Sequence, residues 1–130
     1  MPKSEKALLL FKPDIYAKEL GAVVLGGIKT LDLNTVEQFK VKFPPEGVFF
    51  LWPRIYGRRW TASLTKALPA RALDVFVFEG IDAIERVIAY KDEIRSANSP
   101  VNSYRNLLHS CDSEADFLRE YAYFRSIATT

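Results

Sequence analysis

Hydrophobic and polar positions follow two different periods along this chain, and these periods separate its expected strands from its expected helices. Ala7–Phe11 and Leu73–Phe78 are short, nearly continuous apolar runs, which are typical of strands buried on both faces. Val36–Phe43 alternates instead, with apolar residues on one face and polar residues on the other, as a half-buried strand does. Leu107–Ser110 is a shorter candidate strand.

Helices are predicted over three further segments, Ile15–Leu31, Ile81–Tyr90 and Glu114–Phe124. Pro13 suits the first turn of the first helix, because the N–H that it lacks needs no partner there. Gly26 and Gly27 weaken that helix by up to about 1 kcal/mol each, or they permit close packing on the sheet. Ser113 supplies N-cap chemistry for the last helix. Lys91–Asn102 is polar and is predicted as a loop.

The aromatic-rich segment Gly47–Arg59 fits either a helix or an irregular loop, and Trp60–Leu68 fits a short helix. Without this insertion and the last helix, the order of elements is βαββαβ. That order predicts an α+β fold of the ferredoxin-like kind, an antiparallel sheet with helices on one face. The extra short helices and the C-terminal helix are additions to it.

Composition narrows the class of protein. The chain has 130 residues, so residues 1–130 are predicted to form a single domain, and a net charge of +2 excludes a polycation. Cys111 is the only cysteine, which excludes an internal disulfide and a multi-thiolate metal site. Met1–Lys6 lacks the apolar core of a signal peptide, and no apolar run is long enough for a bilayer. We therefore expect a cytoplasmic protein without membrane contact.

His109 is the only histidine, and its imidazole is the candidate nucleophile near neutral pH. A histidine in an apolar run is more often structural than catalytic, so the residues around His109 must distinguish the two roles. If the helix after Ser113 folds back beside the strand Leu107–Ser110, the rise per residue of the two elements brings Glu120 toward His109. A carboxylate there would fix the ring tautomer and leave the other nitrogen to attack. Otherwise Glu120 is a solvated helix residue.

Cations and aromatic rings gather between Arg54 and Arg71, a stretch without an acidic residue. Tyr56 and Trp60 lie among these cations, a combination that suits a nucleotide or a single strand of nucleic acid. The same pattern fits an ordinary solvated face whose rings serve the core. Lys12 directly follows a buried strand and can reach a phosphate from there, although a lysine at such a place is usually a surface residue.

Three motifs stand in register along the chain: Lys12-Pro13-Asp14, Glu79-Gly80, and the run RNLLHSCDS over Arg105–Ser113. Together they resemble the nucleoside diphosphate kinases, over about Lys6 to Phe124. The resemblance implies transfer of the terminal phosphoryl group of a nucleoside triphosphate to a nucleoside diphosphate. The transfer would run through a phosphohistidine at His109, with Mg²⁺ carried by the nucleotide and no metal held by the protein.

The resemblance also implies how the nucleotide is held. Asn106 would bond the ribose region, and Lys12 would bond the ribose hydroxyls and the phosphates. Trp60 would stack on the base, and Leu64 would lie against the same base. Arg95 is the expected phosphate-binding arginine.

The remaining roles concern the histidine and its surroundings. Tyr56 resembles the tyrosine that buttresses the histidine, and Glu120 resembles the acid that holds its other ring nitrogen. Arg86 and Ser113 are further candidate nucleotide-binding residues, although Arg86 lies about 200° round an ideal helix from Ile88. Ile88 stands where the family has a phosphate-binding arginine.

Such departures favour an alternative function, a catalytically weak or inactive nucleotide-binding protein of the same fold. Cys111 stands where the family has a serine, and the stretch before His109 is shorter than in the family. The family's members are homo-oligomers, and the short segment Lys91–Asn102 favours a homodimer over a hexamer. Nucleoside tri- and diphosphates are the expected partners, and nucleic acid is not.

Overall fold

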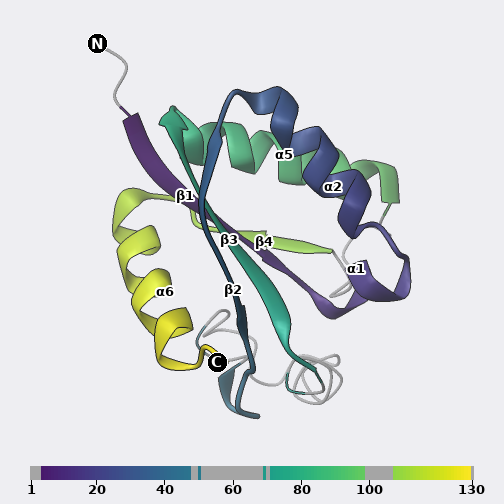
Figure 1. Ribbon diagram of the computed structural model, residues 1–130, viewed down its shortest axis with the longest axis vertical. Helices are drawn as coiled ribbons and strands as arrows, with labels where there is room; N and C mark the ends of the chain where they lie inside the picture. The colour runs from purple at the N-terminus through teal and green to yellow at the C-terminus, as the bar shows by residue number, and fades with distance from the viewer. Residues whose placement is uncertain (1–3, 48–49, 51–68, 70, 99–106, 130) are drawn as a thin grey trace.

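The computed structural model describes residues 4–47, 50, 69, 71–98 and 107–129. The chain there forms, in order, β1 (Ser4–Phe11), α1 (Pro13–Ala17), α2 (Gly21–Ile28), the 3-10 turn η1 (Lys29–Leu31), β2 (Asn34–Val41), β3 (Leu73–Ile81), α5 (Ala83–Asn98), β4 (Leu108–Ser110) and α6 (Glu114–Ser126) (Figure 1). The predicted helix Trp60–Leu68 and most of the aromatic segment Gly47–Arg59 lie outside the described residues.

The four strands form one antiparallel sheet in the order β2-β3-β1-β4. β1 and β3 are central, and their runs of consecutive buried residues produce the two apolar runs in the sequence. β2 and β4 form the edges, which is why β2 alternates between exposed and more buried positions. The predicted α+β fold with a ferredoxin-like order of elements is confirmed.

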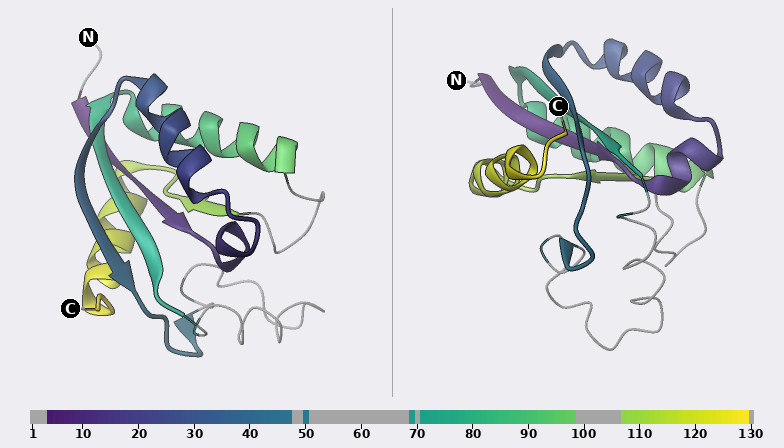
Figure 2. Two further views of the ribbon diagram at one scale, coloured as in Figure 1. Left: turned by 45° about the vertical axis from the view of Figure 1, so that its right-hand side comes forward. Right: turned by 60° about the horizontal axis from the view of Figure 1, so that its bottom comes forward.

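The register of the strands shows which helix covers which face of the sheet. Leu10 of β1 pairs with both Val75 of β3 and His109 of β4, and directly paired residues point to the same face. Val75 also pairs with Phe39 of β2, whose ring meets Tyr121 of α6 edge-on. α6 therefore covers the face that carries His109, while α2 and α5 lie side by side across the other face (Figures 1 and 2).

The predicted helix Ile15–Leu31 is wrong in its continuity, because the chain breaks it into α1, α2 and η1. The break falls at Glu19, which has a left-handed φ of 55°. On α1, the Tyr16 hydroxyl donates to the Asp74 carboxylate at 2.6 Å and accepts from the Asp74 N–H at 2.8 Å. These bonds hold α1 at the start of β3, and α2 must turn away from it to lie across the sheet.

α5 continues to Asn98, whereas the sequence predicts a loop from Lys91 onward. Ile94 packs against the hydrophobic core, one and two turns beyond the buried residues Tyr90 and Val87. The polar residues between them have ordinary helix propensity, so core packing is sufficient to extend the helix. Arg95 consequently projects from a helix and not from a loop.

β1, β3 and the last helix also extend beyond their predicted ends. β3 runs to Ile81, beyond the predicted end at Phe78, because β1 starts early enough to pair with it: Ser4 lies opposite Ile81. α6 ends at Ser126, after the predicted Phe124. These differences lengthen elements without changing their order.

A glycine sets the distance between α2 and α5 on the helical face. The Tyr90 hydroxyl of α5 donates to the Val24 carbonyl of α2 at 2.9 Å. A Cβ added to Gly27 would stand 2.1 Å from that hydroxyl oxygen, so any side chain at this position would force Tyr90 to shift. A Cβ on Gly26 would meet nothing within 4 Å. Of the two glycines, only Gly27 is needed for close packing, and it packs against helix α5 and not against the sheet.

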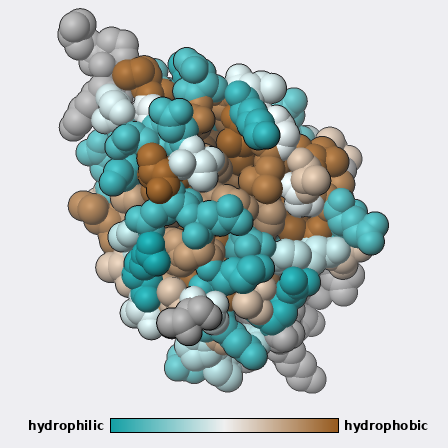
Figure 3. Space-filling view, viewed as in Figure 1, coloured by the Kyte–Doolittle hydropathy of each residue, from teal (hydrophilic) through white to brown (hydrophobic). Residues whose placement is uncertain are grey.

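In the view of Figure 3, hydrophilic residues cover most of the face and apolar colour gathers in the region of α2, where Val23 is exposed. In the described part of the chain, no helix has the length and apolar character needed to cross a membrane.

Candidate active site

His109 and Glu120 meet on the α6 side of the sheet. β4 presents His109, and α6 begins directly after Ser113, whose hydroxyl accepts from the Asp116 N–H at 3.1 Å. Glu120 lies on the sheet-facing side of α6, with its Oε1 at 2.8 Å from His109 Nε2. The side chains are 13% and 4% exposed, respectively. The strand and helix spacing in the sequence predicts this meeting, and the structure contains it.

The pair determines which ring nitrogen can act as a base or nucleophile. A carboxylate only accepts hydrogen bonds, so Glu120 receives the Nε2–H of His109. The neutral ring then carries its lone pair on Nδ1. Arg119 Nη2 donates to the other carboxylate oxygen of Glu120 at 3.4 Å. The arrangement matches an imidazole oriented by an acid for attack through Nδ1.

Lys12 lies at the end of β1, next to the chain that leads into β4. Its N–H donates to the Leu107 carbonyl at 2.8 Å, and its extended backbone places its side chain on the same face as Leu10 and His109. The residue is only 2% exposed. Burial, followed by repulsion from Arg95, lowers the pKa of Lys12 to about 7. The nearby Asp14 carboxylate opposes this shift without cancelling it.

The lowered pKa of Lys12 has a consequence for stability. In the unfolded chain this lysine keeps its proton up to its ordinary pKa of 10.5, whereas the folded protein releases it near pH 7. Between these values the unfolded state binds more protons, so stability rises with pH, by up to about tenfold in the folding equilibrium per pH unit. Urea unfolding at pH 7 and pH 9 should show the rise in the unaltered protein and a smaller one in Lys12→Met. Equal slopes in both proteins would contradict a neutral, buried Lys12.

Arg95 lies beside β4, the outer strand of the described sheet. Its Nη2 donates to the Leu108 carbonyl at 2.5 Å, directly before His109 in the chain. Burial lowers the pKa of Arg95, while Asp92, Asp112 and Asp14 act in the opposite direction. An arginine remains charged despite such a shift, so it supplies a permanent positive charge near the histidine.

The chain enters β4 through a strained residue. Leu107 has a φ of 68°, a left-handed conformation that is unfavourable for a bulky side chain. Its N–H points to both carboxylate oxygens of Asp14, at 3.3 and 3.2 Å. Strain of this kind persists where surrounding contacts impose it, and it concentrates at functional sites.

Two of the candidate nucleotide-binding residues lie apart from this group. The Arg86 guanidinium donates to the Leu31 carbonyl at 2.7 Å, among the helices on the opposite face of the sheet. It stands nine residues before Arg95 on α5, a separation of about 13 Å along the helix axis. Ser113 caps α6 and lines a hollow that does not include His109.

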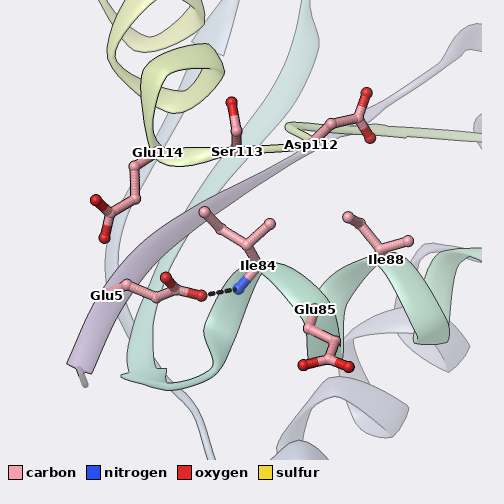
Figure 4. Close-up of a pocket in the computed structure, with 7 residues that line it drawn as sticks. All are labelled: Glu5, Ile84, Glu85, Ile88, Asp112, Ser113 and Glu114. Atoms are coloured by element: carbon pink, nitrogen blue, oxygen red, sulfur yellow. Dashed lines mark hydrogen bonds between the residues drawn. The ribbon is translucent and has the colours of Figure 1, made fainter. Parts of the chain in front are cut away.

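That hollow lies between the start of α5 and the loop before α6. It has a volume of about 310 Å³ and is lined by two isoleucines, one serine and four acidic residues: Ile84, Ile88, Ser113, Glu5, Glu85, Asp112 and Glu114 (Figure 4). Glu5 accepts the Ile84 N–H at 3.0 Å, which satisfies a donor at the start of α5. The excess of carboxylates makes this a poor place for a phosphate.

The other candidates, Tyr56, Trp60, Leu64 and Asn106, lie outside the described residues. Among the residues that are described, no cluster of three or more His, Cys, Asp or Glu side chains could hold a metal ion. The thiol of Cys111 is buried, and burial raises its pKa to about 11, so it is an unreactive thiol at neutral pH.

One charged residue near the site escaped prediction. Lys91 is buried on α5, one turn before Arg95, at a place where the sequence suggests a polar loop. The sequence offered one signal for Lys91, its spacing of four residues from Arg95. This spacing places both cations on one side of a helix, but only if the helix continues past Tyr90.

The fold is similar to that of solved nucleoside diphosphate kinases. The enzyme from Aquifex aeolicus superposes with a TM-score of 0.74 at 22% identity, over 93% of this chain and 94% of that one. The Halobacterium salinarum enzyme in complex with CDP gives 0.74 at 18% identity, over 98% and 93%. An NDP kinase from Pyrobaculum aerophilum gives 0.68 at 20% identity, over 94% and 96%. The described part of the chain therefore has the fold of these kinases.

Sequence comparisons add nothing to this likeness: no protein-family model matches the chain, and no curated protein matches it by sequence.

Proposed function

We propose that the protein is a nucleoside diphosphate kinase, which moves a terminal phosphoryl group between nucleotides through a phosphohistidine at His109. The observation that carries the proposal is the 2.8 Å contact between His109 Nε2 and the buried Glu120 carboxylate. Lys12 and Arg95 lie next to the strand that bears this histidine. A fold shared with three such kinases supports the same function.

In the proposed reaction, the Nδ1 lone pair of His109 attacks the terminal phosphorus of a magnesium–nucleoside triphosphate. An N–P bond forms, the P–O bond to the neighbouring phosphate breaks, and the nucleoside diphosphate leaves with that oxygen. Glu120 keeps the Nε2 proton in place and stabilises the positive charge that develops on the ring. A terminal phosphate oxygen of an acceptor diphosphate then attacks the same phosphorus, and the N–P bond breaks.

The cations neutralise the phosphate charge during this transfer, which depends mainly on positioning and electrostatics. Arg95 and Lys12 are the described residues proposed for this role. Asn106, Trp60, Leu64 and Tyr56 keep their predicted roles toward the ribose, the base and the histidine. The homodimer stays a prediction, which light scattering at micromolar concentration would check.

Incubation with γ-labelled ATP tests the function. We expect label on the protein that is lost in acid, as a phosphohistidine requires, and that moves to an added nucleoside diphosphate. The second candidate, an inactive nucleotide-binding protein, is favoured by Ile88, which is partly buried against the core and offers no charge. Bound ATP without any labelled protein would reject the kinase and establish that candidate.

A further inference from the structure

Lys91 is a buried lysine to which the proposed reaction assigns no role. It is 8% exposed, and no described residue comes close enough to form an ion pair or a hydrogen bond with it. The stem of Lys91 is buried, whereas its Nζ is not among the fully buried polar atoms without a partner, so the ammonium group still reaches solvent and is open to a ligand.

The neighbouring groups do not neutralise Lys91. Asp92 and Asp112 attract it from a distance, but both are exposed to water, which screens their charge. Cys111 also lies near, yet its pKa of about 11 leaves the thiol neutral at physiological pH. Burial and the charge of Arg95 outweigh the attraction of these groups, and the pKa of Lys91 is lowered.

Lys91 belongs to a group of three buried or half-buried cations. Lys91 and Arg95 are four residues apart on α5 and hence lie on the same side of the helix. Arg95 contacts the carbonyl that precedes His109, and Lys12 is bonded through its backbone to the same connecting segment. Lys12 feels repulsion from both other cations. Three cations are thus gathered from β1 and α5 around the edge of β4.

We propose that Lys91 is a phosphate-binding residue, which completes with Lys12 and Arg95 a three-cation cradle for the polyphosphate of the substrate. The inference rests on the proposed function for the identity of that substrate. A polyphosphate offsets the repulsion among the three cations, since its negative charge attracts all of them within a poorly solvated site. Lys91 stands one turn beyond Ile88, so it supplies the positive charge that α5 lacks at that position.

Binding of inorganic tripolyphosphate, measured by calorimetry, tests the cradle directly. We expect Lys91→Gln to weaken binding about 10- to 100-fold, the effect of losing one hydrogen bond between charged groups. Lys91→Arg should retain most of the affinity. The matched control is Lys29→Gln, an equal change of charge at an exposed lysine in η1, which should bind as the unaltered protein does.

Thermal unfolding without ligand separates this role from a structural one. Because the Lys91 ammonium group forms no ion pair with a described residue, Lys91→Gln should unfold at the same temperature as the unaltered protein or at a higher one. Weaker binding together with a lower melting temperature would assign Lys91 to structural support and overturn the proposal. So would unchanged affinity in Lys91→Gln, or no binding by the unaltered protein.

The test also distinguishes the two proposals from each other. Tripolyphosphate binding requires no phosphoryl transfer. If binding depends on Lys91 but ATP never labels the protein, the kinase function fails and the cradle stands. If ATP labels the protein but Lys91→Gln binds tripolyphosphate normally, the cradle fails and the kinase function stands.

Discussion

Replacement of His109 by alanine is expected to abolish incorporation of phosphate from γ-labelled ATP, and Glu120→Gln to slow it about 10- to 100-fold. Alanine removes the attacking nitrogen. Glutamine keeps an oxygen that can accept the Nε2–H of His109, but it removes the negative charge that stabilises the ring as it becomes positive. If the amide turned its NH₂ toward Nε2, the lone pair would move to the wrong nitrogen and the loss would be greater.

Single-turnover labelling by rapid quench measures this effect as a rate. Glu85→Gln is the control, because it removes an exposed carboxylate from α5 that makes no contact with His109. Its rate should equal that of the unaltered protein. Rapid labelling of Glu120→Gln at His109 would show that the carboxylate does not assist the transfer. Labelling of His109→Ala would place the phosphoryl group on another residue.

Gly27→Ala and Gly26→Ala are expected to change stability in opposite directions, although they are adjacent in α2. Alanine at Gly27 would force Tyr90 to move, since the new Cβ stands 2.1 Å from its hydroxyl oxygen and 2.7 Å from the adjacent ring carbon. The shift breaks the bond from Tyr90 to the Val24 carbonyl and separates α2 from α5. We expect a loss of about 2–4 kcal/mol in the free energy of unfolding.

Alanine at Gly26 meets open space and gains helix propensity, so we expect a gain of about 0.5–1 kcal/mol. Thermal and urea unfolding, followed by circular dichroism, measure both changes. Because the two variants add the same methyl group to the same helix, any general effect of composition cancels between them. Equal effects at both positions would show that the contact with Tyr90 does not constrain the packing of the helices.

Local patterns in the sequence were sufficient to predict the strands, because the buried positions of each strand are visible as apolar residues in its own segment. Ala7–Phe11 and Leu73–Phe78 are continuous apolar runs, and they became the two central strands. The order of elements then implied the confirmed antiparallel fold. The same local spacing indicated that Glu120 could meet His109, because the strand that carries His109 and the helix that carries Glu120 are joined by a short turn.

Two features depended on partners that are distant in the sequence. α5 extends past Lys91 because Ile94 finds a place in the core, and nothing within its own segment reveals that place. Likewise, the adjacent glycines of α2 look equivalent in sequence, and only the position of Tyr90, 63 residues beyond Gly27, makes one of them indispensable.

By itself, the amino-acid sequence determined the class of fold and indicated that Glu120 could reach His109, the proposed nucleophile, because short-range spacing and residue chemistry carry that information. Only the tertiary structure decided which cations surround the site. It turned Arg86 toward the helices and brought Lys91 and Arg95 to the edge of β4. The physical reason is that charge acts through space: the neighbours of a buried ammonium group depend on how helix and sheet pack, not on their order along the chain.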